Sequence, residues 1–290
     1  MNRRTFLAAS GAFAALPLPA LATPYEHVAA IAHSVPGVVG VYCRTLADGP
    51  PLFEYNERVQ FPTASTIKAL IMVTAYFEEE HHPGTLAHRI TTHRSELIGG
   101  SDFMAQQDDG ARFSVHELIV PMITLSDNTA SNYLIGYFGM AKINAVARRL
   151  GMLRTRLARH FLDFEAIVHH NDNVTTPADM ARLLYAIASG AREGVKTICT
   201  PEHCRAMIAI MLRQTDRNKI PAGLPPGIAV ANKTGELDGS RSDIAIIQPL
   251  GDSPYILTVY SKWLEEYPPM YGAFHRIARL SYAMARGTYT

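Results

Sequence analysis

Ser65 and Lys68 lie three residues apart in the stretch FPTASTIKALIM, residues 61–72. A serine hydroxyl becomes an effective nucleophile when a neighbouring base takes its proton, and a lysine is such a base when its pKa is lowered. This spacing places both side chains on one face of a helix, and the apolar run IKALIMVTAYF predicts that the helix is buried. The unpaired N–H groups at the helix start also favour negative charge beside Ser65. The pair predicts a nucleophile with its base, although SxxK alone more often marks a helix cap followed by a surface lysine.

Two further triplets favour the catalytic interpretation of Ser65 and Lys68. The triplet SDN at 126–128 lies between two apolar segments, and KTG at 233–235 ends the strand-like stretch IAVANKTGE. Each alone is an ordinary turn or edge-strand sequence. In this order, however, SxxK, SDN and KTG are the motif set of class A β-lactamases and penicillin-binding proteins. The chain resembles a class A β-lactamase over nearly all of residues 25–286, including SVHELIVPMITLSDNTASNYLIGYFG, TTPADMARLL and the triplet GSR at 239–241.

The resemblance implies a role for each of these residues. Ser65 is the nucleophile that opens an amide or β-lactam carbonyl to form an acyl-enzyme, and Lys68 is its base. Ser126 passes the proton to the leaving nitrogen, while Asp127 braces the turn. The backbone N–H groups of Ser65 and Glu236 form the oxyanion hole. The substrate-binding residues implied by the resemblance are Asn128 for the substrate's side-chain amide, Thr234 and Arg241 for its carboxylate, and Lys233, Gly235 and Glu236 along the same edge of the cleft; no cofactor or metal is implied.

The loop TRLARHFLDFEAIVHHNDNVTTP departs from the family pattern. Class A β-lactamases carry an ω-loop glutamate here, which activates the water that releases the acyl group, and an asparagine four residues later. The alignment puts Phe161 at the glutamate position and Glu165 at the asparagine position. Without a carboxylate beside it, Lys68 has a lower pKa and is a better base for acylation, whereas hydrolysis of the acyl-enzyme slows. The alternative is a reshaped loop in which Glu165 or Asp163 activates the water.

Glu236 is a second departure, because the family usually carries a small or hydroxylated residue beside the substrate carboxylate. An anion there would repel the carboxylate of a penicillin. Both departures resemble the penicillin-binding-protein-A-like branch of the family, whose members act on D-Ala-D-Ala peptides. Two enzyme hypotheses therefore stand nearly level. The first is a β-lactamase, slowed by the missing glutamate, in which Glu165 or Asp163 of a reshaped loop has taken the water-activating role. The second is a D-alanyl-D-alanine carboxypeptidase or transpeptidase of peptidoglycan that β-lactams inhibit. A non-catalytic penicillin-binding sensor is a weaker third, because the usual transmembrane and signalling segments are absent.

The hydrophobic pattern predicts the elements that must position these residues. Of the 290 residues, 48% are hydrophobic, which is enough to bury a sizeable core. We expect an α/β fold of the β-lactamase/transpeptidase type, with a five-stranded antiparallel sheet flanked by helices and an all-α part. The expected segments are a helix at 25–34, strands at 38–46 and 51–57, helices at 65–77, 115–123, 130–138, 140–150 and 177–188, strands at 228–236, 242–249 and 255–263, and a helix at 271–286. Residues 23–290 then form one catalytic domain, with an α/β subdomain made of 23–62 and 212–290 and a helical subdomain at 63–211.

Charge and the N-terminal sequence indicate the partner and the compartment. The 27 basic and 26 acidic residues leave a net charge of +1, which offers no footprint for nucleic acid, so the expected partner is a small molecule, a β-lactam or D-Ala-D-Ala peptide. Residues 1–22 read as a signal peptide, and Arg3-Arg4 resembles a twin-arginine export signal. We expect an exported, periplasmic or secreted monomer without a stable membrane span. In that compartment Cys199 and Cys204 could form a disulfide, which the sequence leaves open.

Overall fold

The computed structural model describes residues 23–192, 197–251 and 253–289, so the predicted signal peptide at 1–22 lies outside the described residues. At its centre is a five-stranded sheet with the strand order β2-β1-β9-β8-β7, and each neighbouring pair is antiparallel. The predicted five-stranded antiparallel sheet is thereby confirmed. Its strands are β1 (Val38–Thr45), β2 (Phe53–Tyr55), β7 (Val230–Leu237), β8 (Ser240–Ile247) and β9 (Tyr255–Lys262).

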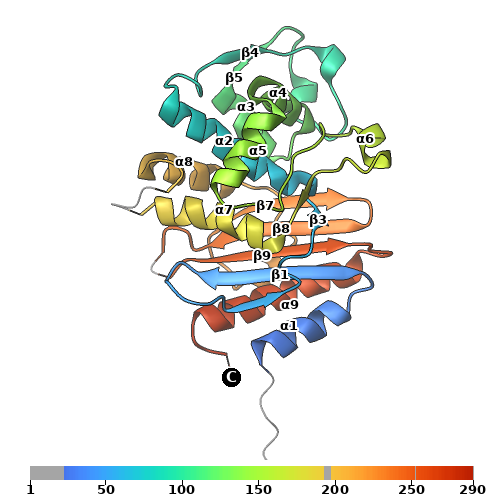
Figure 1. The fold of residues 1–290 in the computed structure, drawn as a ribbon, viewed down its shortest axis with the longest axis vertical. Coiled ribbons are helices and arrows are strands. Elements are labelled where there is room, and N and C mark those ends of the chain that lie inside the picture. The colour runs from blue at the N-terminus through green and yellow to red at the C-terminus, as the bar shows by residue number, and fades with distance from the viewer. Residues whose placement is uncertain (1–22, 193–196, 252, 290) are drawn as a thin grey trace, which may run out of the picture.

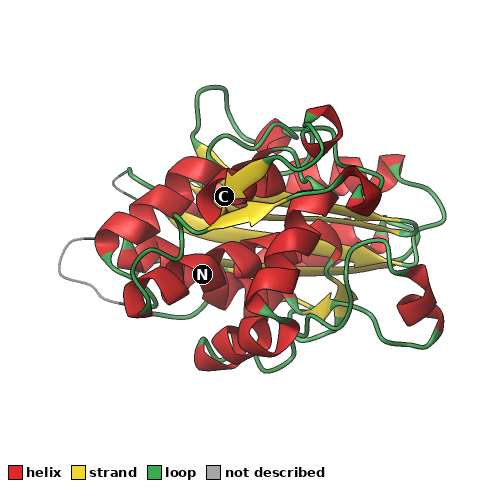
Figure 2. Ribbon diagram, turned by 90° about the horizontal axis from the view of Figure 1, so that it is seen from above, coloured by secondary structure: helices red, strands yellow, loops and turns green. Residues whose placement is uncertain are grey.

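Helices cover both faces of this sheet (Figure 1), and in the view from above the strands run between them (Figure 2). In β9, Leu257 and Val259 belong to the hydrophobic cluster beneath α1 (Pro24–His33) and α9 (Pro268–Ala285). Tyr260 belongs instead to the cluster on the opposite face, beneath the helical layer. This alternation is the period of two that a strand buried on both faces must follow.

The helical layer is built around α2 (Lys68–His81), whose residues from Lys68 to Tyr76 are all buried. Because α2 is apolar around its whole circumference in this part, other helices must surround it. The elements that contact α2 are η1 (Ala64–Ile67), α3 (Val115–Thr124), α4 (Asn128–Phe138), α5 (Met140–Arg149) and α8 (Pro201–Met211). The other helices and turns are η2 (Arg94–Glu96), η3 (Met104–Gln106), α6 (Phe164–Val168), α7 (Pro177–Gly190) and η4 (Pro221–Gly223), of which η4 packs against α9.

Two small sheets accompany the region predicted to be helical, 63–211, and three of their four strands lie inside it. One pairs β3 (Phe61–Pro62) with β6 (Val174–Thr175), and the other pairs β4 (Arg89–Thr91) with β5 (Arg112–Ser114). Strands of two or three residues are too short to show an alternating pattern, which explains why the sequence did not reveal them. The β3–β6 pair matters for the site, because it joins the segment before Ser65 to the end of the ω-loop.

Two remaining expectations concern the cysteines and the membrane. The Cys204 thiol lies 3.8 Å from the carbonyl oxygen of Cys199, so the structure shows Cys204 as a thiol rather than as half of a disulfide. Cys43 is fully buried in β1, where it packs as a core thiol. Within the described ranges, no helix has both the length and the apolar character needed to cross a bilayer.

Candidate active site

Ser65 lies in the 3₁₀ turn η1, and Lys68 begins α2. The expected single helix therefore starts with a tighter turn. In a 3₁₀ turn residues three apart eclipse each other, so the SxxK spacing aligns the two side chains more closely than a regular α-helical turn would. Ala64 enters this turn with φ of 45°, a conformation that few non-glycine residues adopt. Such local strain is typical of residues that must present a side chain at a functional site.

Lys68 connects the SxxK motif to the SDN motif. Its Nζ atom donates to the backbone oxygen of Ser126 at 2.6 Å, to Ser126 Oγ at 3.2 Å and to Asn128 Oδ1 at 2.7 Å. Lys233 approaches the same hydroxyl from β7, with 3.0 Å between its Nζ and Ser126 Oγ. The hydroxyl of Ser126 thus lies between two lysines, an arrangement that allows a proton to move along the three side chains.

The side chains of Asp127 and Asn128 hold the SDN turn through hydrogen bonds to neighbouring backbone groups. Ser126 has φ of 61°, and Asp127 caps α4 by accepting a hydrogen bond from the N–H of Ala130 at 2.9 Å. The second carboxylate oxygen of Asp127 accepts from the N–H of Met104 at 3.0 Å. Asn128 donates through Nδ2 to the carbonyl oxygen of Gly99, which leaves its Oδ1 for Lys68. Asp127 accordingly braces the turn, while its neighbours on either side contact the lysine.

Both site lysines are fully buried, and burial sets their protonation. Desolvation moves the pKa of Lys68 well below its ordinary value; the positive charge of Lys233 lowers it further, and Asp127 opposes the change. Burial likewise lowers the pKa of Lys233 to about 7, against the opposing charges of Asp243 and Asp216. These shifts favour the neutral amine at Lys68, which is the form that accepts a proton from a hydroxyl.

Strand β7 forms one wall beside Ser65. Lys233 and Gly235 face the helical layer, where Lys233 contacts Ser126 and Gly235 lies against Ala64 and Ser65. Side chains alternate along a strand, so Thr234 and Glu236 project from the opposite side. A Cβ atom at Gly235 would lie 3.1 Å from the backbone nitrogen of Ser65 and 2.5 Å from Ser242 Oγ, so glycine is what allows β7 to approach η1 this closely. β7 is an edge strand of the sheet, and edge strands present unpaired N–H groups. The arrangement suits an oxyanion hole made by backbone N–H groups of η1 and β7.

The ω-loop brings Phe161, rather than a carboxylate, to the site. Lys68 Nζ lies 4.3 Å from the centroid of the Phe161 ring. Asn132 fixes this position through both ends of its amide: its Oδ1 accepts from the N–H of Phe161 at 2.8 Å, and its Nδ2 donates to the carbonyl oxygen at 3.2 Å. Glu165 is exposed on α6, and Asp163 caps that helix by accepting from the N–H of Ala166. The structure therefore brings Phe161 to Lys68, and it places Glu165 and Asp163 on the outer part of the loop.

A small cleft of about 60 Å³ opens at Ser65 between the ω-loop and β7. Glu165 is absent from the described residues that line it. Among the described residues no group of three or more His, Cys, Asp or Glu side chains could hold a metal ion. The lining residues are Ala64, Ser65, Asn128, Arg159, Phe161, Leu162, Phe164, Asn173, Glu236 and Leu237.

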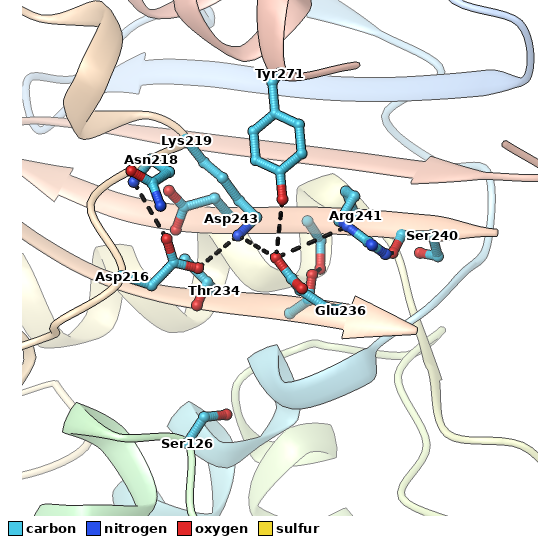
Figure 3. A network of polar contacts seen from close by, with 12 residues as sticks. Ser126, Asp216, Asn218, Lys219, Thr234, Glu236, Ser240, Arg241, Asp243 and Tyr271 are labelled. Atoms are coloured by element: carbon cyan, nitrogen blue, oxygen red, sulfur yellow. Dashed lines mark hydrogen bonds and ion pairs between the residues drawn. The ribbon is translucent and has the colours of Figure 1, made fainter. Parts of the chain in front are cut away.

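Glu236, Arg241 and Thr234 lie on the α9 side of β7 and β8, away from Ser126 (Figure 3). Glu236 Oε1 accepts hydrogen bonds from Lys219 Nζ at 2.7 Å and from the Tyr271 hydroxyl at 3.2 Å. Arg241 was expected to receive a substrate carboxylate, but its Nη1 donates to two backbone carbonyl oxygens, those of residues 237 and 240, each at 2.8 Å. Glu236 and Arg241 are thus already engaged by other groups of the protein, which the sequence did not show.

Two residues that position the site were missed in the sequence. Asn132, which holds Phe161, lies four residues after Asn128 and hence on the same face of α4. That spacing was the available signal. Lys219, which holds Glu236, lies in the irregular segment before β7, where no periodic pattern could have revealed it.

The comparisons with known proteins agree with this geometry. The Beta-lactamase2 family, described as a β-lactamase enzyme family, matches residues 23–285. The chain is 32% identical to β-lactamase CTX-M-25 of Escherichia coli over 254 residues, which cover 85% of this chain and 84% of the relative. It is 31% identical to a β-lactamase of Proteus vulgaris over 211 residues, covering 71% of this chain and 68% of the relative.

Two solved structures span nearly the whole described fold. An ancestral class A β-lactamase superposes with a TM-score of 0.80 at 28% identity, covering 89% of this chain and 98% of that chain. A variant of PBP-A, solved as an acyl-enzyme complex with penicillin G, superposes with a TM-score of 0.77 at 26% identity, covering 88% of this chain and 94% of that chain. The chain thus belongs to the class A β-lactamase family of penicillin-recognising proteins and is a serine hydrolase of that family.

Proposed function

We propose that this enzyme is acylated on Ser65 by β-lactams and hydrolyses the resulting ester slowly. The observation that carries the proposal is the Phe161 ring, 4.3 Å from Lys68 Nζ, at the sequence position where the family has its water-activating glutamate. The acylation groups are assembled around Ser126, whereas the aromatic ring supplies no base for the second step.

In the acylation step, neutral Lys68 takes the proton of the Ser65 hydroxyl as Ser65 Oγ attacks the β-lactam carbonyl. Negative charge on the carbonyl oxygen is stabilised by backbone N–H groups of Ser65 and Glu236. As the C–N bond breaks, Ser126 gives its proton to the leaving nitrogen, and Lys68 or Lys233 restores the proton of Ser126. The contacts of both lysines with Ser126 Oγ, at 3.2 Å and 3.0 Å, support this route.

In the deacylation step, a water molecule must be deprotonated as it attacks the ester. A general base contributes roughly 10²- to 10⁴-fold to such a step. Phe161 cannot act as a base, and Glu165 is exposed on α6 outside the cleft lining. Hydrolysis must then rely on Lys68 itself or on unassisted water, and the acyl-enzyme is expected to persist.

The second candidate is a D-alanyl-D-alanine carboxypeptidase or transpeptidase that β-lactams inhibit. The same feature favours the transpeptidase in particular, because an enzyme that transfers its acyl group to an amine uses a good nucleophile and needs no water-activating carboxylate. A carboxypeptidase, like a β-lactamase, releases its acyl group to water and would share the slow second step. A penicillin-binding sensor is the third outcome, in which the acyl-enzyme forms once and no peptide is cleaved. We also propose that the enzyme is periplasmic or secreted, because its expected signal peptide and a cell-wall or antibiotic substrate indicate the same compartment. We propose in addition that it acts as a monomer.

The experiment that tests the proposal follows intact protein mass over time after residues 23–290 are mixed with benzylpenicillin, together with the loss of free drug. We expect a persistent adduct with slow drug consumption, and no adduct with Ser65→Ala. Rapid drug loss without a lasting adduct would refute the slow hydrolysis proposed here, and labelling of Ser65→Ala would refute the mechanism. Release of D-Ala from a D-Ala-D-Ala peptide would then separate the peptidase from the slow β-lactamase and the sensor.

A further inference from the structure

Thr234 and Glu236 project from the same side of β7, toward α9 (Figure 3). A substrate that acylates Ser65 must pass Glu236, because Glu236 lines the cleft together with Ser65. The Glu236 side chain is 47% exposed, so its charge lies at the rim of the cleft in contact with solvent rather than in the core. The residue that follows the KTG motif is therefore in a position to decide which groups are accepted at this end of the cleft.

Lys219 and Tyr271 hold Glu236 in place. The side chain of Lys219 is fully buried, and its Nζ lies 2.5 Å from Asp216 Oδ2 and 2.7 Å from Glu236 Oε1. Burial alone would lower the pKa of Lys219, but the two carboxylates outweigh it and raise the pKa above the ordinary value. Lys219 is therefore a permanent cation whose charge is already used by two partners within the protein.

Arg241 is also engaged. Its guanidinium stacks on the Tyr267 ring, with 3.7 Å between the Cζ atom and the ring centroid, and its Nη1 donates to two backbone carbonyl oxygens. The Nε atom is buried without a hydrogen bond and lies 3.8 Å from Glu236 Oε1. With Asp216, Lys219 and Glu236, Arg241 completes a cluster of two carboxylates and two cations, whose charges sum to zero.

We infer that Glu236 makes this end of the cleft a charge-compensated subsite, which selects amide substrates carrying a neutral or positively charged group beside Thr234 instead of a free carboxylate. An incoming carboxylate meets one anion, Glu236, and two cations that are already paired, so it must displace an ion pair or remain poorly solvated. The preferred substrates are then amides whose leaving group is extended or amidated, rather than those that end in a free carboxyl group. Lys219 and Tyr271 are positioning residues that act through Glu236. This inference rests on the proposed acylation of Ser65 and specifies the substrate class of that same site.

The test compares benzylpenicillin with its methyl ester, which differ in the charge of one group. Second-order rate constants for acylation are measured by intact mass for the wild-type protein and for Glu236→Gln, which removes the charge and keeps an oxygen for Lys219. Because a unit charge a few ångströms from the carboxylate is removed, we expect the acid-to-ester rate ratio to rise about tenfold in Glu236→Gln. The methyl ester is the reference, because a change in the cleft that does not depend on charge alters the acylation rates of the acid and the ester equally.

Asp238→Asn is the matched control. Asp238 is an exposed acid two residues further on, and its Oδ1 accepts a hydrogen bond from Tyr267, which asparagine can preserve. Its acid-to-ester ratio should equal that of the wild-type protein. If the ratio were the same in Glu236→Gln and wild type while Ser65 was still acylated, the substrate-class inference alone would be overturned. If neither compound labelled the wild-type protein, the proposed function would fail and the inference with it.

Discussion

Replacing Phe161 with glutamate should convert a persistent acyl-enzyme into one that turns over. The backbone of Phe161 is held at both its N–H and its carbonyl by Asn132, and its ring lies 4.3 Å from Lys68 Nζ. A glutamate carboxylate at this position would therefore lie close to Lys68 and to the ester on Ser65. A general base is worth roughly 10²- to 10⁴-fold, so the adduct lifetime in Phe161→Glu should shorten by about that factor.

The same substitution should slow the acylation of Ser65. Two unit charges about 4 Å apart interact by about 4 kcal/mol at an effective dielectric constant of about 20. A new carboxylate at this distance would therefore raise the pKa of Lys68, against the lowering caused by burial and by Lys233. A raised pKa reduces the fraction of neutral Lys68 at neutral pH. Labelling of Phe161→Glu should therefore be slower than that of the wild-type protein and should accelerate more steeply as the pH rises.

Stopped-flow mixing followed by intact mass separates these two effects, because the rise of the adduct reports acylation and its decay reports hydrolysis. Phe161→Gln is the control, since it has nearly the size of glutamate but is not a base. The expected order of adduct decay is fast for glutamate and slow for glutamine and phenylalanine. If Phe161→Glu and Phe161→Gln decayed at the same rate, Phe161 would not occupy the water-activating position, and our explanation of slow hydrolysis would be wrong.

Three single substitutions test the coupling of the two lysines, the role of Glu165 and the close approach of β7 to η1. In Lys233→Met, loss of the like charge should raise the pKa of Lys68, so the acid limb of the labelling rate should move to higher pH; an unchanged limb would contradict the coupling. Glu165→Gln should leave the adduct lifetime in a mass time course unchanged, because the carboxylate is exposed on α6; a lifetime at least tenfold longer would restore it as the water-activating base. Gly235→Ala should reduce the labelling rate by at least tenfold, since the new Cβ would lie 3.0 Å from Ala64 Cβ and 3.1 Å from the backbone nitrogen of Ser65; labelling at the wild-type rate would show that β7 need not approach η1 closely.

The sequence revealed those parts of the site that depend on local patterns. The SxxK spacing indicated that Ser65 and Lys68 share a face, and the apolar run after Lys68 indicated that the lysine is buried, as the structure shows. The long strands and helices were predictable for the same reason, since each repeats its hydrophobic period several times. The contacts that hold Phe161 and Glu236 could not be read in this way. They join Asn132 and Lys219 to residues 29 and 17 positions away, and no local pattern records such pairs.

The residue at position 161 and the burial of Lys68 both affect the pKa of this lysine. The proposed role of Lys68 as a base requires the neutral amine. Charged or aromatic groups near Lys68 Nζ change the pKa of Lys68 because they stabilise or destabilise its ammonium form. A carboxylate in contact with Lys68 stabilises the ammonium strongly, whereas an aromatic ring in the position of Phe161 stabilises it by only about 0.5–2 kcal/mol. Under the proposed mechanism, phenylalanine at position 161 therefore both lowers the pKa of the acylation base and removes the deacylation base. We therefore propose that an enzyme with this loop forms acyl-enzymes at neutral pH and keeps them, so that the residue facing Lys68 decides between an enzyme that destroys β-lactams and one that is trapped by them.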